Sequence, residues 1–301
     1  MSLSFSNKVR EEIYYVINDS NKKFACLYGM LLYCKSFSQN SLVFQTESRI
    51  SASLFIELID SVFKGQIVVK FRDNSNLLTC IIDSEKHIKL ITDRYNIICD
   101  DRKICENWIT SCNIGLLTGG IFLVCGSVND PEKDYHLEFS TPNITLAEQL
   151  RQILSAVGVK TKCFTRKNSI VVYIKDSESI EDTLTFIGAQ ACTLELMDTK
   201  ITKELRNQVN RSTNCYSANL DKVMNAAVKQ TEDIRLIERV KGLECLDDSL
   251  RELAELRLLY PVASLNELGE KLRISISRSG INHRFKRLSK IAEELRRGNI
   301  E

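Results

Sequence analysis

One internal repeat, with a period of about 90 residues, limits the folds that this chain of 301 residues can adopt. The first copy contains an apolar helix, a strand, a second helix and a hairpin, expected at residues 24–34, 42–45, 50–63 and 66–82. The second copy has the same order at residues 116–126, 135–139, 146–157 and 160–175. Polar residues at 72–76 and 166–168 predict the hairpin turns. Two tandem copies of one plan predict an α+β fold with pseudo-twofold symmetry.

The opening helix of each copy is apolar on every side, which indicates burial. These helices contain Gly29, Gly119 and Gly120. Glycine lowers helix propensity but lets two backbones approach closely. We therefore expect the two helices to pair across the pseudo-twofold axis. The alternative is that they are core helices of two separate domains.

A polar, basic segment follows the repeats. Over residues 201–245, Asn side chains alternate with Arg and Lys, and there is no Pro. This composition predicts a helical connector.

A compact all-α unit is expected after the connector, with helices at residues 249–260, 264–272 and 279–295. Ser264 and Glu267 have the spacing of a capping box, and Ser279 is placed to cap the third helix. Ile281, Phe285 and Leu288 form the apolar stripe of that third helix. Three short helices of which the third is exposed correspond to the helix-turn-helix plan.

The third helix of this unit carries a concentrated positive charge. Residues 271–290 include seven basic residues and no acidic residue, although the net charge of the whole chain is only +2. Arginine, asparagine and hydroxyl side chains suit base edges and phosphates, so the pattern predicts binding of double-stranded DNA. The alternatives are a solvated basic face and a module that docks an acidic protein. The candidate DNA-contacting residues are Lys271, Arg273, Arg278, Ser279, Asn282, His283, Arg284, Lys286, Arg287 and Lys290. Arg278, Asn282, His283 and Arg284 are the candidates for base readout, and the lysines and Arg287 for phosphates.

Several segments resemble the WhiA family of bacterial regulators. The resemblance is carried by residues 120–131, 135–138, 210–215 with 218–219, 264–269 and 277–284. It implies a tandem LAGLIDADG homing-endonuclease-like domain followed by an all-α helix-turn-helix domain. It also implies a role in sporulation, cell division and chromosome segregation through transcription regulation. We expect an N-terminal arm or helix at 1–20 and a LAGLIDADG-like domain at 21–200, with repeats at 21–110 and 111–200. The connector would then occupy 201–245 and the helix-turn-helix domain 246–301, with its DNA-contacting motif at 263–296.

The resemblance also raises the question of nuclease activity. Homing endonucleases hold divalent metal with a carboxylate at the end of each paired helix. Alignment of that motif places Cys34 and Cys125 at the two carboxylate positions, and thiols are poor ligands for Mg²⁺. We therefore expect a protein without enzymatic activity, catalytic residues, metal or cofactor. The competing interpretations are a nuclease that uses acids outside the motif, such as Asp130 or Glu132, and a protein-interaction scaffold.

Composition and termini limit the remaining classes. Hydrophobic residues make up 44% of the chain and charged residues 27%, which argues against a largely disordered protein. The chain has no recognisable signal peptide and no apolar window long enough for a membrane span, so we expect a cytoplasmic, nucleoid-associated bacterial protein. Its 11 cysteines are then expected to be reduced. The expected partners are double-stranded DNA and a protein bound by the LAGLIDADG-like domain, with no membrane and no small-molecule substrate.

Overall fold

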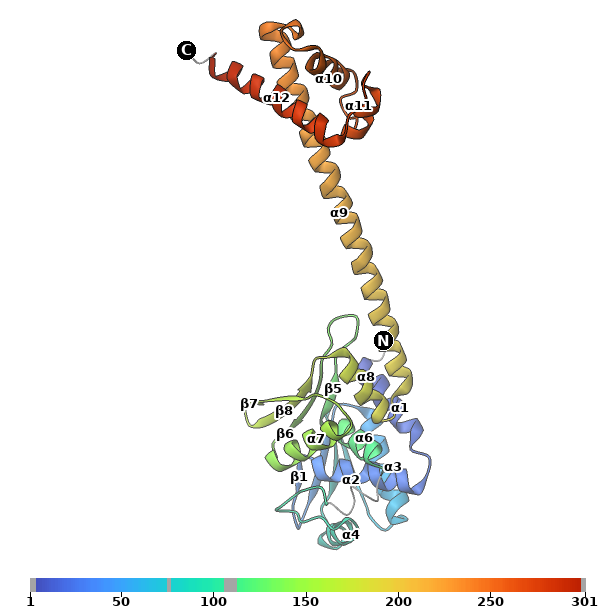
Figure 1. The fold of residues 1–301 in the computed structure, drawn as a ribbon. Coiled ribbons are helices and arrows are strands. Elements are labelled where there is room, and N and C mark those ends of the chain that lie inside the picture. The colour runs from blue at the N-terminus through green and yellow to red at the C-terminus, as the bar shows by residue number, and fades with distance from the viewer. Residues whose placement is uncertain (1–3, 75–76, 106–112, 299–301) are drawn as a thin grey trace. The chain divides into compact units, whose positions relative to one another are not determined.

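The computed structural model describes residues 4–74, 77–105 and 113–298. These residues form two compact units, Met1–Lys203 and Glu204–Glu301. The first unit is α+β and the second is helical (Figure 1).

The first half of the α+β unit contains four helices and four strands among its described residues. They are α1 (Phe5–Val16), α2 (Ser20–Tyr33), β1 (Ser36–Phe37), β2 (Leu42–Thr46), α3 (Arg49–Phe63), β3 (Lys70–Asn74), β4 (Leu77–Ile82) and α4 (Glu85–Tyr95). The strands form an antiparallel sheet in the order β1-β2-β4-β3.

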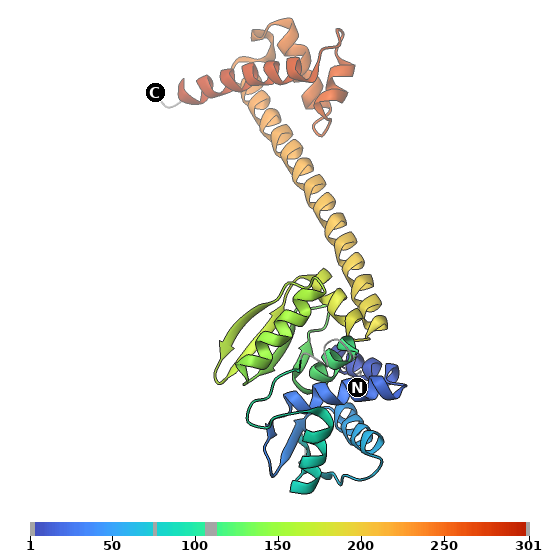
Figure 2. The same cartoon turned by 60° about the horizontal axis from the view of Figure 1, so that its bottom comes forward.

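The second half follows the same plan. Its elements are α6 (Ile114–Cys125), β5 (Gly126–Val128), β6 (Leu137–Thr141), α7 (Ile144–Ala156), β7 (Lys162–Arg166), β8 (Ser169–Ile174) and α8 (Ser177–Phe186). The sheet order is β5-β6-β8-β7, which is the order of the first sheet again. Helix α7 lies across one face of this sheet (Figures 1 and 2). The predicted tandem repeat is therefore confirmed.

The repeat differs from the prediction at its strands. Each copy has a short additional strand directly after its opening helix, β1 in the first copy and β5 in the second. The first hairpin strand begins at Lys70, and residues expected in the turn, Arg72–Asn74, belong to the strand. Arg166 likewise belongs to β7, and the turn contains Lys167 at a positive φ of 54°. Polar residues read as turns can extend an edge strand, because an edge strand exposes most of its side chains to water.

The two opening helices, α2 and α6, pair with each other, as the glycines predicted. A Cβ atom added at Gly29 would collide with the carbonyl oxygen of Leu117, and one at Gly120 would collide with the carbonyl oxygen of Cys26. Each glycine thus faces the backbone of the opposite helix. The α+β unit is therefore one domain with a shared core, and the alternative of two separate domains is wrong.

The N-terminal helix α1 belongs to this core. Phe5, Val9 and Ile13 are buried on one of its faces. On another face, the Glu12 carboxylate accepts hydrogen bonds from the backbone N–H groups of Ala191 and Cys192, at 2.7 and 2.9 Å. These N–H groups open helix α9 (Gln190–Lys241), so a side chain from the first helix caps a helix nearly 180 residues later.

The helical unit contains the C-terminal part of α9, a 3₁₀ turn η1 (Leu243–Cys245), α10 (Asp248–Leu259), α11 (Leu265–Lys271) and α12 (Arg278–Gly298). Ile234 and Ile237 of α9 are buried in the same core as Leu253, Leu268 and Phe285. The sequence placed these two isoleucines in the connector, but they are part of the packed unit.

Candidate nucleic-acid interface

The helix-turn-helix is formed by α10, α11 and α12, and each begins at a capping side chain. The Asp247 carboxylate accepts from Leu250 N at 2.9 Å. The predicted capping box of α11 is present: Ser264 Oγ accepts from Glu267 N, and Glu267 Oε2 accepts from Ser264 N. The prediction that Ser279 caps the third helix is wrong, because Ser277 Oγ accepts from Gly280 N and the helix already includes Ser279.

Close packing between α11 and α12 determines which face of α12 is exposed. Gly269 of α11 is buried, and a Cβ atom there would lie 2.8 Å from the side chain of Ile281. Ile281, Phe285 and Leu288 are buried, as predicted, and Ala292 continues their stripe. The opposite face of the helix is therefore directed to solvent.

Four exposed polar residues share that outer face of α12. Ser279, His283, Lys286 and Lys290 are spaced i, i+4, i+7 and i+11, which places them in one row along a helix. We call these four residues the outer row. It offers a hydroxyl, an imidazole and two ammonium groups, all hydrogen-bond donors suited to phosphate oxygens or base edges.

Two of the predicted contact residues lie beside the outer row and make contacts within the protein. Arg284 is half-buried, and its Nη1 donates to the carbonyl oxygen of Ser249 at 3.3 Å. Arg287 forms an ion pair with Asp247 at 3.0 Å. Both arginines connect α12 to the start of α10. Base readout by Arg284 stays a prediction, and it requires this hydrogen bond to break.

Arg278 and Asn282 lie on the other side of the outer row. Both are exposed, and together with Lys222 of α9 they line a hollow of about 380 Å³. The remaining candidates, Lys271 and Arg273, are exposed at the end of α11, where Lys271 Nζ lies 4.5 Å from the centre of the Tyr260 ring. The structure thus exposes nine of the ten predicted side chains, half-buries Arg284, and bonds Arg284 and Arg287 to the start of α10.

Arg257 on α10 is a structural residue that the sequence did not reveal. It is only 2% exposed, and its Nη1 donates to the carbonyl oxygen of Ala263 at 2.6 Å. Its guanidinium also stacks over Phe285, and burial lowers its pKa. The bond fixes the turn between α10 and α11, where Pro261 removes one backbone donor.

The paired helices of the α+β unit end at the two predicted cysteines. Cys125 is the last residue of α6, and Cys34 directly follows α2. Burial raises the pKa of each thiol to about 12, so both remain protonated at neutral pH. A protonated thiol is a poor ligand for a hard divalent cation.

Guanidinium groups contact the backbone at both helix ends. Arg102 Nη1 donates to the carbonyl oxygens of Leu32 and Cys34, at 3.0 and 2.7 Å. Arg10 Nη2 donates to the carbonyl oxygen of Gly126 at 2.8 Å, and burial lowers the pKa of Arg10. These cations neutralise the negative ends of the two helix dipoles. A metal ion at either helix end would face a neighbouring positive charge.

The acids considered as replacements, Asp130 and Glu132, are exposed in the loop after β5. Asp130 Oδ1 accepts a hydrogen bond from Glu132 N at 2.9 Å, and Lys203 Nζ donates to the carbonyl oxygen of Pro131 at 2.6 Å. Across the described residues, no group of three or more His, Cys, Asp or Glu side chains has a geometry that could hold a metal ion.

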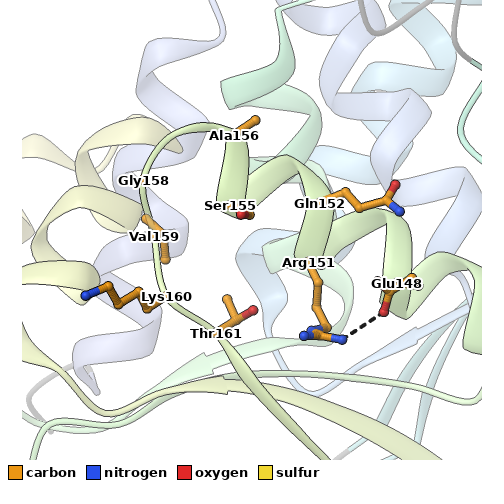
Figure 3. Close-up of a pocket in the computed structure, with 9 residues that line it drawn as sticks. All are labelled: Glu148, Arg151, Gln152, Ser155, Ala156, Gly158, Val159, Lys160 and Thr161. Atoms are coloured by element: carbon orange, nitrogen blue, oxygen red, sulfur yellow. Dashed lines mark hydrogen bonds and ion pairs between the residues drawn. The ribbon is translucent and has the colours of Figure 1, made fainter.

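A hollow of about 750 Å³ in the α+β unit is lined by α7 and by the segment that leads from α7 to β7. Figure 3 shows Arg151 directed to Glu148 along one side, and this ion pair measures 2.9 Å. Lys160 and Thr161 lie across from them (Figure 3). The lining contains no cysteine, histidine or second carboxylate, so it has no evident acid–base or nucleophilic pair.

The exposed face of the second sheet holds a cluster that the sequence did not indicate. Glu138 accepts hydrogen bonds from Arg166 at 2.8 Å and His136 at 3.2 Å. Burial would raise the pKa of Glu138, but these two bonds outweigh burial and lower it. Tyr173 stacks on His136 and contacts Phe164, which remains 43% exposed. Strand pairing brings these side chains together. In the sequence, only the alternation of inward and outward side chains along β6, β7 and β8 could have suggested the cluster.

The fold and these two regions define a class of two-part proteins, in which a LAGLIDADG-like domain precedes a helix-turn-helix domain. Residues 115–206 match the profile of the WhiA LAGLIDADG-like domain, and residues 209–292 match that of the WhiA C-terminal HTH domain. The chain belongs to the WhiA family. A relative from Clostridium perfringens (strain SM101 / Type A), named "Probable cell division protein WhiA", is 41% identical over 317 residues, which cover 99% of this chain and 100% of the relative.

Two solved structures have a similar fold. Full-length WhiA from Thermatoga maritima gives a TM-score of 0.59 at 24% sequence identity, covering 97% of this chain and 99% of that structure. The isolated N-terminal LAGLIDADG domain of a WhiA protein gives a TM-score of 0.50 at 18% identity, covering 62% of this chain and 94% of that structure. Among the described helices, none combines the length and apolar character that a membrane span requires.

Proposed function

We propose that this chain binds double-stranded DNA through α12 and controls cell division by regulating transcription. The observation that carries the proposal is the outer row, Ser279, His283, Lys286 and Lys290, which is exposed and free of acidic side chains. A helix-turn-helix inserts its last helix into the major groove, and this row is the part of α12 that can reach DNA without unpacking the core. Arg278 and Asn282 extend the row toward base edges, while Arg284 and Arg287 hold α12 in place.

A selection from random duplexes with the full chain tests specific recognition and supplies a binding site. On that site, Lys286→Ala with Lys290→Ala is expected to weaken binding. It should also reduce by about two the salt slope, meaning the slope of the logarithm of the binding constant against the logarithm of the salt concentration, since each phosphate contact contributes about one unit. Arg239→Ala with Lys241→Ala is the matched control, because it removes two exposed charges from the end of α9. An equal effect of the two double variants, or no selected sequence, would contradict the proposal.

We also infer that the chain does not cleave DNA. The support is the pair of protonated thiols at Cys34 and Cys125 and the guanidinium groups of Arg102 and Arg10 beside them. Incubation of plasmid with the protein and Mg²⁺ or Mn²⁺ should leave the plasmid intact. Metal-dependent cleavage that is lost in Asp130→Asn or Glu132→Gln would establish the competing nuclease interpretation.

The role in cells is proposed from the relatives' printed name, which includes cell division. Sporulation, chromosome segregation and location at the nucleoid are further parts of this proposal. Mapping of bound chromosomal sites in cells that carry the wild-type chain or the Lys286→Ala, Lys290→Ala variant tests them together. Sites near division or sporulation genes that vanish in the variant would support the proposal, and a random distribution of sites would contradict it.

A protein partner is the proposal for the LAGLIDADG-like unit, supported by the aromatic and basic cluster on its second sheet. Phe164 is exposed beside Arg166, and such side chains are common at interface centres. Cross-linking of the full chain in cells, with Phe164→Ala compared with Val157→Ala on the nearby α7 end, tests this surface. A cross-linked protein lost only in Phe164→Ala would support it.

A further inference from the structure

A long part of helix α9 is exposed, although Lys222, Val223 and Ala226 near its end line the hollow beside Arg278 and Asn282. Every residue from 204 to 226 is exposed. The segment includes five asparagines, and asparagine has a low helix propensity because its side chain competes for backbone hydrogen bonds. Most helices in proteins are stabilised by packing of an apolar face rather than by propensity. We therefore expect another protein surface to pack against this segment.

The segment has one apolar face. Its members are Leu205, Val209, Thr213, Tyr216, Leu220 and Val223, and we call them the seam. At 3.6 residues per turn, the six positions fall within about 80° of arc. Leu205, Val209, Tyr216 and Leu220 are 58, 63, 72 and 50% exposed. Their alternating spacings of three and four residues from Val209 onward are those of a two-stranded coiled coil.

Charge distribution indicates which partner fits this seam. From Val209 onward, the positions that flank it are uncharged: Asn210, Ser212, Ser217, Asn219, Met224 and Ala226. The charged residues Arg211, Asp221 and Lys222 lie on the opposite face, and Arg206 lies beside the N-terminal end of the seam. From Val209 onward, two identical helices can therefore meet along the seam without like-charge repulsion, and a charged partner would find no complementary charge on these flanks.

The available area is that of a small but specific interface. Burial of an aliphatic side chain removes roughly 100 Å² from water, so six from each of two copies give about 1,200 Å², near the lower limit for specific association. The Thr213 hydroxyl within the seam weakens the pairing further. A dimer held by the seam should therefore dissociate on dilution.

We propose that residues 205–227 of α9 pair with the same segment of a second copy of this chain as a two-stranded coiled coil. The inference is independent of DNA binding, because it rests on the exposed seam alone. When the chain is bound to DNA, such pairing joins two helix-turn-helix units in one assembly.

Sedimentation velocity of the full chain without DNA, over a wide range of concentration, tests this proposal. The wild type should shift from monomer toward dimer as the concentration rises. Leu220→Glu places like charges in the seam and should remain monomeric. Ala218→Glu adds the same charge two residues away on the opposite face and should dimerise like the wild type.

A second pair of variants strengthens the interface and so does not depend on a loss of folding. Thr213→Leu fills the polar seam position in both copies and should tighten dimerisation at least about tenfold. Asn214→Leu introduces the same apolar side chain on the opposite face and should leave the dissociation constant of the dimer unchanged. A chain that stays monomeric at all concentrations, or equal behaviour of the seam and opposite-face variants, would overturn the proposal.

Discussion

The Asp233 carboxylate on α9 accepts a hydrogen bond from Arg296 Nη2 on α12 at 2.7 Å. Asp233 is only 1% exposed, and its second oxygen accepts from Ser289 Oγ, also at 2.7 Å. A buried carboxylate needs such partners, because an unpaired buried charge is strongly destabilising. These two hydrogen bonds fix α12, the last helix of the helix-turn-helix, against α9. Asp233 belongs to the part of α9 that the sequence predicted to be a connector.

Asp233→Ala should destabilise the helical unit by about 2–3 kcal/mol, because it leaves the Ser289 hydroxyl and Arg296 without their acceptor. Arg296→Gln should cost a similar amount, about 2–3 kcal/mol, because it leaves the buried Asp233 carboxylate without its countercharge. Arg297→Gln changes an exposed neighbour and serves as the control. Chemical unfolding followed by circular dichroism measures the difference. Equal stability of the three variants would show that the buried pair does not anchor α12.

Arg284→Ala and Lys286→Ala should affect different properties although they are two residues apart. Arg284 donates to Ser249, so its loss should lower stability by about 1 kcal/mol and leave the salt slope of DNA binding unchanged. Lys286 is exposed in the outer row, so its loss should reduce the salt slope by about one and leave stability unchanged. Fluorescence anisotropy at several salt concentrations, together with thermal unfolding, separates the two effects. The reverse pattern would return Arg284 to the DNA-contacting set.

Gly29→Ala and Gly120→Ala should each destabilise the α+β unit by about 1–3 kcal/mol or more, because the new Cβ atom would meet a backbone carbonyl of the facing helix. The two losses should not add, since both changes separate the same helix pair. Gly298→Ala is a suitable control, because a Cβ atom there meets nothing within 4 Å. Differential scanning calorimetry of the full chain measures the change. Unchanged melting of Gly29→Ala would contradict the close pairing of α2 and α6.

The stability of the α+β unit should fall at alkaline pH because of its buried thiols. Burial raises the pKa of Cys34 and Cys125 to about 12, whereas an unfolded cysteine titrates near 8.5. The stabilisation is fully present below about pH 8.5 and is lost as the pH rises toward 12, since the unfolded chain releases these protons first. Unfolding at a series of pH values should show this decline.

Alkylation provides an independent measure of how accessible the same thiols are to solvent. Near neutral pH, iodoacetamide should modify the exposed Cys215 and Cys245 well before Cys34 and Cys125. Peptide mass spectrometry resolves the order. Reaction of Cys34 as fast as Cys215 in the folded protein would mean that the helix end is open to solvent and that the proposed loss of metal binding needs revision.

The amino-acid sequence by itself determined the features that depend on local periodicity. These are the tandem repeat, the glycines between the two opening helices, the Ser264–Glu267 capping box and the apolar stripe of α12. The capping box and the stripe arise from residues a few positions apart, and the repeat and its glycines appear when two such local patterns are compared along the chain. The positions of Cys34 and Cys125 at the helix ends also followed from alignment with a short motif.

Only the tertiary structure decided which partner each long side chain meets. Arg284 and Arg287 belong to the same run of basic residues as Lys286 and Lys290, but they bond to residues 35 and 40 positions away at the start of α10. Arg102 reaches the end of α2 from 68 residues away, and Arg257 is buried against a turn. A flexible cation can point to water or to a distant carbonyl oxygen, and sequence spacing does not distinguish these states. The packing of the helices distinguishes them, because it fixes which carbonyl oxygens and carboxylates lie within reach.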